Sequence, residues 1–190
     1  MMFLEHNLTI EQLIKGCRNG ERKAQEGLYK LFAAKMLGVC MRYATDKMEA
    51  EDMMQNGFIK VFNKLNDFRG EGSFEGWVRR IMVHASIEYY RKHHKMMQVV
   101  DIDTAHDVQG VDPLVASNLG VKDLLALIQQ LPPGYRMVFN LYAIEGYSHK
   151  EVGEMMTITE GASKSQLSRA RTILKEQITK MEGKRYENVG

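Results

Sequence analysis

The feature that most constrains the fold is an acidic stretch, residues 96–120, that divides the chain into two blocks. It contains four Asp and neither Lys nor Arg, and it lacks a helical period. We interpret it as a linker, because long structureless loops inside compact domains are uncommon. A chain of 190 residues can hold one large domain or two small ones. The stretch therefore predicts two domains, at residues 1–95 and 121–183, with a tail at 184–190.

The two blocks that flank this linker both have helical patterns. Apolar residues recur at helical spacing from Leu28 to Val39, and again from Val121 to Leu131, where Pro132 and Pro133 end the run. No alternating strand pattern with hairpin signals stands out. We therefore predict an all-α fold, in two small helical domains joined by a flexible acidic linker.

Charge and cysteine content narrow the class of protein. The net charge is +2, but the first block carries +4, the linker −4 and the last block +2. Two basic blocks make nucleic acid a candidate partner. Two Cys without a CxxC pair cannot form a disulfide framework or a zinc knuckle, so we expect a reducing, cytoplasmic location. We also expect no signal peptide and no membrane insertion, because no apolar run approaches about 18 residues.

The C-terminal block has the pattern of a helix-turn-helix. Ser148 and Glu151 have the spacing of a capping box, and Thr159 is a candidate cap for a second helix that begins near Gly161. Short side chains on that helix would let it enter the major groove, where Arg can bind guanine and Lys can neutralise phosphate. The spacing alone supports an ordinary solvated face equally well. The apolar stripe consists of Leu167, Ala170, Leu174 and Ile178, and the other faces carry Lys164, Ser165, Ser168, Arg169 and Thr172.

Residues 131–176 resemble the C-terminal domain of bacterial RNA polymerase sigma factors of the extracytoplasmic-function group. The matches are Leu131-Pro132, Glu145-Gly146 and the run from Lys164 to Arg171. In that family the domain binds the −35 element of the promoter. The sequence departs from the family at Ala162 and Ser163, where Thr and Val are usual, and we expect a changed base preference rather than a changed fold. Gln166 is a third departure, since a basic residue is common there. The resemblance implies −35 contacts from Lys164, Ser165, Gln166, Ser168 and Arg169.

Residues 50–65 have the pattern of an amphipathic helix with an unusual polar side. Asp52, Gln55, Asn56 and Asn63 share that side with Ile59. An exposed Ile among an acid and amides suits a small docking surface for a partner with basic groups. An ordinary polar face with one stray Ile is the alternative.

The same residues resemble the Ala-Glu-Asp-x-x-Gln-x-x-Phe segment of the sigma family. In the family this helix binds the coiled coil of the polymerase β′ subunit. The resemblance implies contacts from Glu51, Asp52, Gln55 and Ile59. Gly57 departs from the pattern, and a glycine weakens a helix interior by roughly 1 kcal/mol relative to Ala.

Residues 68–95 combine a glycine-containing loop with another amphipathic helix. Basic groups beside Trp77, Tyr89 and Tyr90 would suit single-stranded DNA, although core positions for Trp77 and Tyr89 are the simpler interpretation. We expect Val78, Ile81, Met82, Ala85 and Tyr89 on the core side and Arg80, His84, Ile87 and Arg91 along another side.

This segment resembles the family's −10 reading motif, Phe-x-x-Trp-Leu-x-Arg-Ile, through Phe74, Trp77, Val78, Arg80 and Ile81. In the family the loop and helix form a pocket for a base flipped out of the melted strand. His84 replaces the usual Asn and Glu88 the usual Asp, so we expect a different or pH-sensitive base preference. The resemblance implies −10 contacts from Phe68, Arg69, Phe74, Arg80, His84, Glu88 and Arg91.

The order of these segments resembles the family over residues 25–95 and 121–178, and it implies promoter-specific transcription initiation. The implied partners are core RNA polymerase, through the β′ coiled coil and the β flap, promoter DNA, and an anti-sigma factor. Two elements two helical turns apart are separated by roughly 70 Å. A linker of 25 residues can extend to roughly 80–90 Å, so it can span them.

Two other functions fit less well. A stand-alone helix-turn-helix regulator would dimerise on two half-sites, but it leaves residues 52–59 and 68–91 unexplained. An enzyme is not supported, because the six His form no HExxH motif and no phosphate loop or nucleophile elbow is present. We therefore expect no catalytic residue, no metal site and no cofactor.

Overall fold

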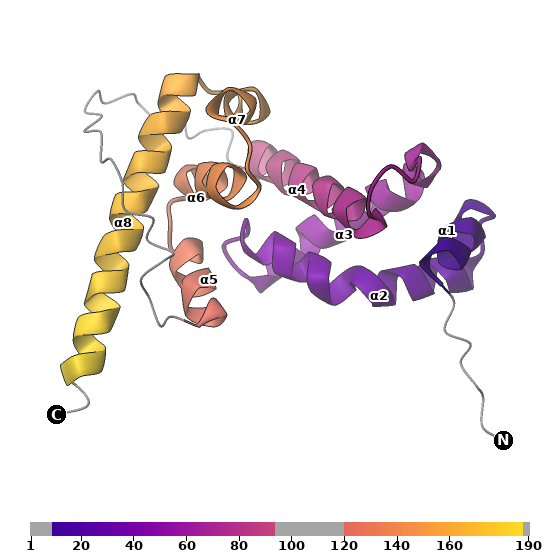
Figure 1. The fold of residues 1–190 in the computed structure, drawn as a ribbon, viewed down its shortest axis with the longest axis horizontal. Coiled ribbons are helices and arrows are strands. Elements are labelled where there is room, and N and C mark those ends of the chain that lie inside the picture. Colours follow the sequence, from indigo (N-terminus) through magenta and orange to yellow (C-terminus); the bar gives the residue numbers. More distant parts are fainter. Residues whose placement is uncertain (1–8, 94–119, 188–190) are drawn as a thin grey trace. The chain divides into compact units, whose positions relative to one another are not determined.

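The computed structural model describes residues 9–93 and 120–187, and every regular element in these two ranges is a helix (Figure 1). The expected all-α fold is thus confirmed. In chain order the elements are α1 (Ile10–Arg18), α2 (Arg22–Met41), α3 (Lys47–Asn63), η1 (Leu65–Asp67), α4 (Phe74–His93), α5 (Val121–Gln129), α6 (Pro133–Phe139), η2 (Asn140–Ile144), α7 (His149–Met156) and α8 (Glu160–Glu187).

The helices belong to two compact units. Unit 1 comprises residues 9–40 and 48–86, and unit 2 comprises residues 41–47, 87–93 and 120–187. The expected pair of helical domains, the second with a helix-turn-helix, is confirmed. The predicted linker lies outside the described residues except for Gly120, which is the N-cap of α5. The predicted boundary at residue 183 falls within α8, which continues to Glu187.

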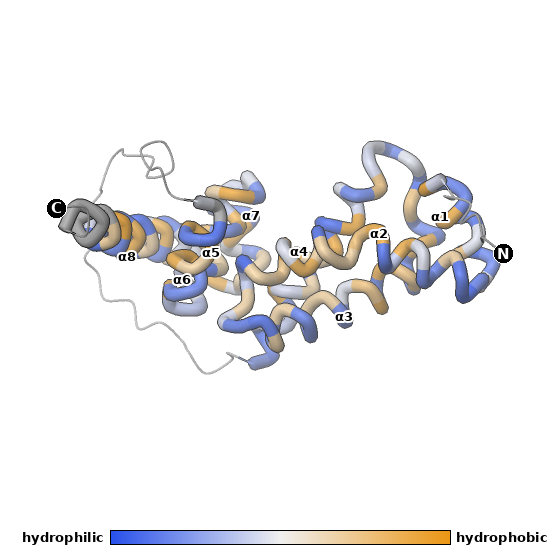
Figure 2. Tube along the Cα trace, turned by 90° about the horizontal axis from the view of Figure 1, so that it is seen from below, coloured by the Kyte–Doolittle hydropathy of each residue, from blue (hydrophilic) through white to orange (hydrophobic). Residues whose placement is uncertain are grey.

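The core of unit 1 is built from the apolar faces of its helices. Figure 2 shows hydrophilic and hydrophobic residues alternating along α2 and α3, as amphipathic helices require. Leu31 shares the helical spacing of its neighbours but remains exposed. The fully buried positions include Leu28, Phe32 and Met36 of α2, Phe58 and Val61 of α3, and Val78 and Met82 of α4.

The structure explains why a glycine stands at position 57, which the pattern of the helix does not indicate. The residue is buried in the middle of α3, and a Cβ built on it would collide with the Sδ atom of Met82. Met82 is itself fully buried, so its side chain has little room to move. The expectation that Gly57 merely weakens α3 is therefore incomplete, because the glycine also makes room for a core side chain.

Replacing Gly57 by Ala is expected to lower the free energy of unfolding by about 1 kcal/mol. Overpacking a core costs about 1–3 kcal/mol, which exceeds the gain of about 1 kcal/mol in helix propensity. Gly38 of α2 is the matched control, since a Cβ there meets nothing within 4 Å. Gly38→Ala should be neutral or stabilising in chemical denaturation. Equal stabilisation by both changes would show that Met82 moves aside freely.

Unit 2 is organised around the long helix α8. Both α6 and α7 pack against it, as Figure 1 shows. Leu167, Ala170 and Leu174 of the predicted stripe are buried, and Ile178 is half-buried. Their partners in the core include Met137, Val138 and Phe139 of α6 and Val152 of α7.

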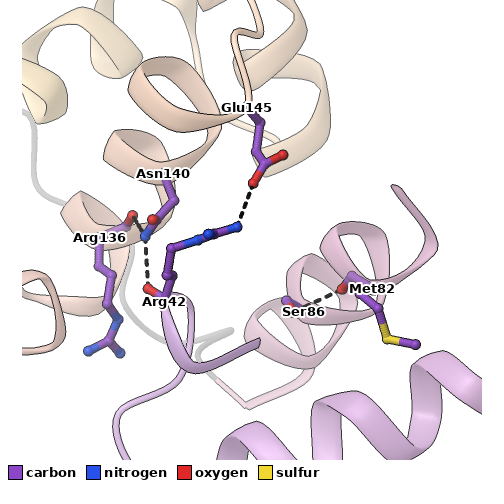
Figure 3. A network of polar contacts seen from close by, with 6 residues as sticks. All are labelled: Arg42, Met82, Ser86, Arg136, Asn140 and Glu145. Atoms are coloured by element: carbon purple, nitrogen blue, oxygen red, sulfur yellow. Dashed lines mark hydrogen bonds and ion pairs between the residues drawn. The ribbon is translucent and has the colours of Figure 1, made fainter. Parts of the chain in front are cut away.

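Residues 41–47 are held within unit 2 by polar contacts (Figure 3). The amide Nδ2 of Asn140 donates to the carbonyl oxygens of Arg42 and Arg136, at 2.8 Å each. The guanidinium of Arg42 forms an ion pair with Glu145 at 3.1 Å. Arg136 is buried, and its guanidinium donates to the carbonyl of Gln129 at 2.6 Å. These bonds satisfy polar groups whose burial would otherwise be costly.

Candidate nucleic-acid and polymerase interfaces

The first helix of the helix-turn-helix, α7, begins as predicted. The hydroxyl of Ser148 accepts a hydrogen bond from the backbone N–H of Glu151, and the Glu151 carboxylate accepts one from the N–H of Ser148 at 2.8 Å. The Ser148 hydroxyl also donates to the Glu151 carboxylate at 2.7 Å, and the hydrogen bonds from the Ser148 N–H and hydroxyl lower the pKa of that carboxyl group. The capping box is therefore confirmed.

The turn between α7 and α8 is tight and depends on local backbone geometry. Thr157 adopts the left-handed conformation with φ of 59°, and the N–H of Ile158 donates to the carbonyl of Gly153 at 3.0 Å. Thr159 then caps α8, since its hydroxyl accepts from the N–H of Ala162 at 3.0 Å. Both predicted caps and the predicted turn are thus present.

The predicted −35 side chains are not equally accessible. Lys164 is exposed, whereas Ser165, Ser168 and Arg169 are half-buried. Gln166 is only 4% exposed, so this structure does not present it on the accessible face of α8, and its DNA contact stays a prediction. It lies beside Gly134 of α6, where a Cβ would come within 3.3 Å of its Oε1 atom. The buried face of α8 is therefore wider than its apolar stripe, because α6 covers the neighbouring row as well.

Two of these side chains are positioned by contacts within unit 2. Lys164 forms an exposed ion pair with Glu160 at 2.8 Å, and this partner raises the pKa of the lysine. The guanidinium of Arg169 donates to the hydroxyl of Tyr135 at 3.2 Å. Both cations thus lie on α8 in defined positions close to its first turns.

One contact between the two helices was not predicted from the sequence. The Nδ1 atom of His149 in α7 lies 2.9 Å from the hydroxyl oxygen of Ser163 in α8, and the Ser163 side chain is fully buried. Ser163 stands where the family pattern has Val, so a polar pair replaces an apolar contact. The only sequence signal was that departure, which does not indicate a partner.

The predicted polymerase-binding residues lie together on α3. Asp52, Gln55 and Asn56 are exposed, Glu51 is half-buried, and Ile59 is 58% exposed. Steps of three and four residues place Asp52, Gln55 and Ile59 on one side of the helix. The structure thus confirms an exposed apolar residue beside polar groups, as the pattern indicated.

The loop before α4 is supported by an aromatic cluster. Phe74 is 6% exposed, and its ring lies 5.0 Å from that of Phe68 and 5.6 Å from that of Trp77, measured between centroids. Phe74 is therefore not presented at the surface, because it forms the buried part of the cluster, and its DNA contact stays a prediction. Phe68 and Trp77 are half-buried and Arg69 is exposed, so these three remain accessible.

The loop is also anchored by Arg18 of α1, which the sequence analysis missed. Its guanidinium donates to the carbonyl oxygens of Phe68 at 2.7 Å and Leu65 at 3.2 Å. A basic residue in the last turn of a helix is common, so nothing in the sequence indicated this role.

Along α4 the predicted basic row is only partly correct. Arg80, His84, Glu88 and Arg91 are exposed, but Ile87 is 3% exposed and does not belong to the accessible row. Val83 is also buried, and with Ile87 it forms a second apolar row at a spacing of four residues. Tyr89, expected in the core, is half-buried.

The described ranges contain neither a cluster of metal ligands nor a helix that could span a membrane. No group of three or more His, Cys, Asp or Glu side chains there could hold a metal ion. None of the helices in those ranges combines the length and apolar character needed to cross a bilayer.

Comparison with known proteins gives one consistent family for both halves of the chain. Residues 28–96 match the family model "Sigma-70 region 2", and residues 122–174 match "Sigma-70, region 4". The RNA polymerase sigma-H factor of Pseudomonas aeruginosa is 26% identical over 180 residues, which cover 86% of this chain and 91% of that protein. The ECF RNA polymerase sigma-E factor of Haemophilus influenzae is 26% identical over 187 residues, which cover 92% of this chain and 98% of that protein.

A solved structure also aligns with the chain. It is the sigma factor RpoE in complex with the anti-sigma factor NepR from Bartonella quintana, with a TM-score of 0.49 and 21% identity, covering 81% of this chain and 96% of that one. From the family models and the sequence relatives, the chain belongs to the sigma-70 family of RNA polymerase sigma factors. Within that family it falls in the extracytoplasmic-function (ECF) group.

Proposed function

We propose that this chain binds core RNA polymerase through α3 and directs it to promoters whose −35 and −10 elements it contacts with separate segments. The observation that carries this proposal is the joint exposure of Asp52, Gln55 and Ile59 on α3 and of Lys164 on the second helix of a helix-turn-helix. A stand-alone regulator would have no function for the surface formed by Asp52, Gln55 and Ile59.

The −35 contacts are assigned to α8. Lys164, Ser165, Ser168 and Arg169 lie near its first turns, where short side chains permit close approach to duplex DNA. Gln166 is excluded from this set because it is buried. The cations bind phosphates or guanine, which is how such helices combine affinity with sequence discrimination.

The −10 contacts are assigned to the loop and to the exposed row of α4. Phe68 and Trp77 offer aromatic surface for an unstacked base, and Arg69, Arg80 and Arg91 offer charge for the backbone. His84 and Glu88 complete the proposed −10 contacts as hydrogen-bonding groups, whereas Phe74 packs against Phe68 and Trp77 within the aromatic cluster. Unstacking a base costs a few kcal/mol, which these contacts offset and so favour the melted strand.

The partners follow from the same surfaces. Asp52 and Glu51 suit basic residues of the β′ coiled coil, and unit 2 is assigned to the β flap and to promoter DNA. An anti-sigma factor is a further proposed partner, and the proposed location is the cytoplasm. The role is that of a non-enzymatic initiation subunit without a metal or cofactor.

The test is run-off transcription with core polymerase on a library of randomised promoters. Enrichment of two separated sequence elements, dependent on addition of this chain, would support the proposal. Strong and specific binding of duplex DNA in a gel-shift assay without polymerase, together with no transcription in the run-off assay, would instead favour a stand-alone regulator.

Replacing Lys164 by Ala is expected to weaken use of a −35-dependent promoter by about 1–3 kcal/mol, or roughly 5-fold to 150-fold. Its exposed ion pair with Glu160 contributes little to stability, so the fold should be unaffected. Lys180→Ala is the control, because Lys180 is exposed on the opposite side of α8, more than four turns away. The assignment of Lys164 would be refuted if the Lys164→Ala and Lys180→Ala variants used the intact −35 element equally well and also used the mutated element equally well.

A further inference from the structure

The contact between His149 and Ser163 joins the two helices of the helix-turn-helix. His149 is the first residue of α7, and Ser163 lies in the first turns of α8 with its side chain fully buried. Their Nδ1 and Oγ atoms are 2.9 Å apart. A buried hydroxyl without this partner would keep the full free-energy cost of its desolvation. The hydrogen-bonded pair therefore favours one relative orientation of α7 and α8.

The imidazole ring is itself held in place by a third element. The ring of Tyr142, in η2, stacks on that of His149 with centroids 4.2 Å apart and planes inclined by 18°. Stacking fixes the plane of the imidazole, and the hydrogen bond fixes its rotation within that plane. Three consecutive elements of unit 2 therefore meet at this histidine.

We propose that His149 is a positioning residue for −35 recognition, which acts by setting the rotation of the first turns of α8. This inference rests on the proposed function of α8. Ser163 directly precedes Lys164 and Ser165, and residues of one helical turn rotate together about the helix axis. Because the Ser163 side chain points inward to His149, the directions in which Lys164 and Ser165 point are set as well.

Burial and two nearby cations favour the neutral form of the His149 ring, which lowers its pKa. Burial, followed by the nearby Lys164, lowers the pKa of His149, while Glu160 opposes this effect and Arg171 adds to it. Lys164, Glu160 and Arg171 approach from α8, and the Tyr142 phenol approaches from η2. In the neutral ring, the tautomer decides whether Nδ1 accepts from the Ser163 hydroxyl or donates to its oxygen, and either arrangement makes the hydrogen bond.

The test compares His149→Phe with the double variant His149→Phe/Ser163→Ala in run-off transcription with core polymerase. Phe keeps a ring on Tyr142 but removes the hydrogen-bonding nitrogen, so we expect a roughly 5-fold to 10-fold loss of discrimination between the intact −35 element and single-base variants of it. Removing the hydroxyl as well should change discrimination by less than about a further twofold, because the hydrogen bond is already absent in His149→Phe. Affinity for core polymerase, measured in parallel, should not change in either variant.

A second readout is the pH dependence of unfolding. Since the folded pKa of His149 lies below the unfolded value of about 6.5, the unfolded chain binds more protons as the pH falls. Its contribution to stability is therefore complete above about pH 6.5 and declines as the pH drops toward the folded pKa. The difference between the original chain and His149→Phe should show this decline.

The outcomes separate this inference from the proposed function. If Lys164→Ala reduces −35 discrimination but His149→Phe does not, His149 has no positioning role. If discrimination is lost and the double variant loses about a further 5-fold or more, His149 and Ser163 act separately, the hydrogen bond between them is not the cause, and the inference is again wrong. If the original chain ignores the −35 element altogether, the proposed function itself fails.

Discussion

Replacing Gly153 by Ala is expected to lower the free energy of unfolding of unit 2 by about 2 kcal/mol. A Cβ at this position would lie 2.9 Å from the carbonyl oxygen of Ile158, and that oxygen belongs to the backbone of the turn. The turn would have to open, which breaks the hydrogen bond from the N–H of Ile158 to Gly153. This cost exceeds the gain of about 1 kcal/mol that Ala brings to a helix.

Gly161→Ala is the matched control for this change. Gly161 lies in the first turn of α8, and a Cβ there would be 3.9 Å from the nearest atom, the hydroxyl oxygen of Thr159. The free energy of unfolding of Gly161→Ala should stay within about 0.5 kcal/mol of that of the original chain, as is usual for exposed positions that make no tight contact. Chemical denaturation followed by circular dichroism measures both. Equal stability of Gly153→Ala and Gly161→Ala would show that the turn accommodates a Cβ without cost.

Replacing Asp52 by Ala is expected to weaken binding of core RNA polymerase by about 2 kcal/mol, or roughly 30-fold in Kd. The carboxylate is exposed on α3 between Gln55 and Glu51, in reach of a basic partner. Truncating one member of a charge pair in an interface leaves the other buried without compensation, which accounts for the size of the effect. Fluorescence anisotropy with labelled chain and purified core polymerase measures the Kd.

Glu26→Ala on α2 provides a charge-matched control for Asp52. Glu26 is exposed and pairs with Lys30 at 2.7 Å on the same helix, so its removal changes the net charge equally without touching α3. It should alter the Kd by less than about twofold, since isolated surface charges contribute little. Unchanged affinity of the Asp52 variant, with an intact fold, would remove α3 from the polymerase interface.

The local elements of this fold follow closely from the sequence. The capping box at Ser148 and the cap at Thr159 depend on residues within three positions of each other, and both are present. The exposed side of α3 was equally readable, because apolar residues at helical spacing fix which side is buried. Ile59 is exposed for that reason, as expected.

The side chains whose burial differs from the expectation are covered by elements remote in the sequence. Gln166 is polar, yet α6 packs beside it and removes it from the accessible face of α8. Phe74 matches a DNA-reading motif, yet it serves as the floor of an aromatic cluster with Phe68 and Trp77. Ile87 was placed in a basic row by its spacing, but α4 buries more than one side.

The sequence by itself determined where helices begin, which residues cap them, and which family the chain resembles, because these depend on neighbours within a turn or two. The tertiary structure alone decided that a Cβ at Gly57 or Gly153 would displace its neighbours and that Ser163 has His149 as its partner. These features depend on atoms of other helices and of the turn backbone that come within about 3 Å only after the chain has folded. Close packing in the folded chain then limits which side chains fit at these positions.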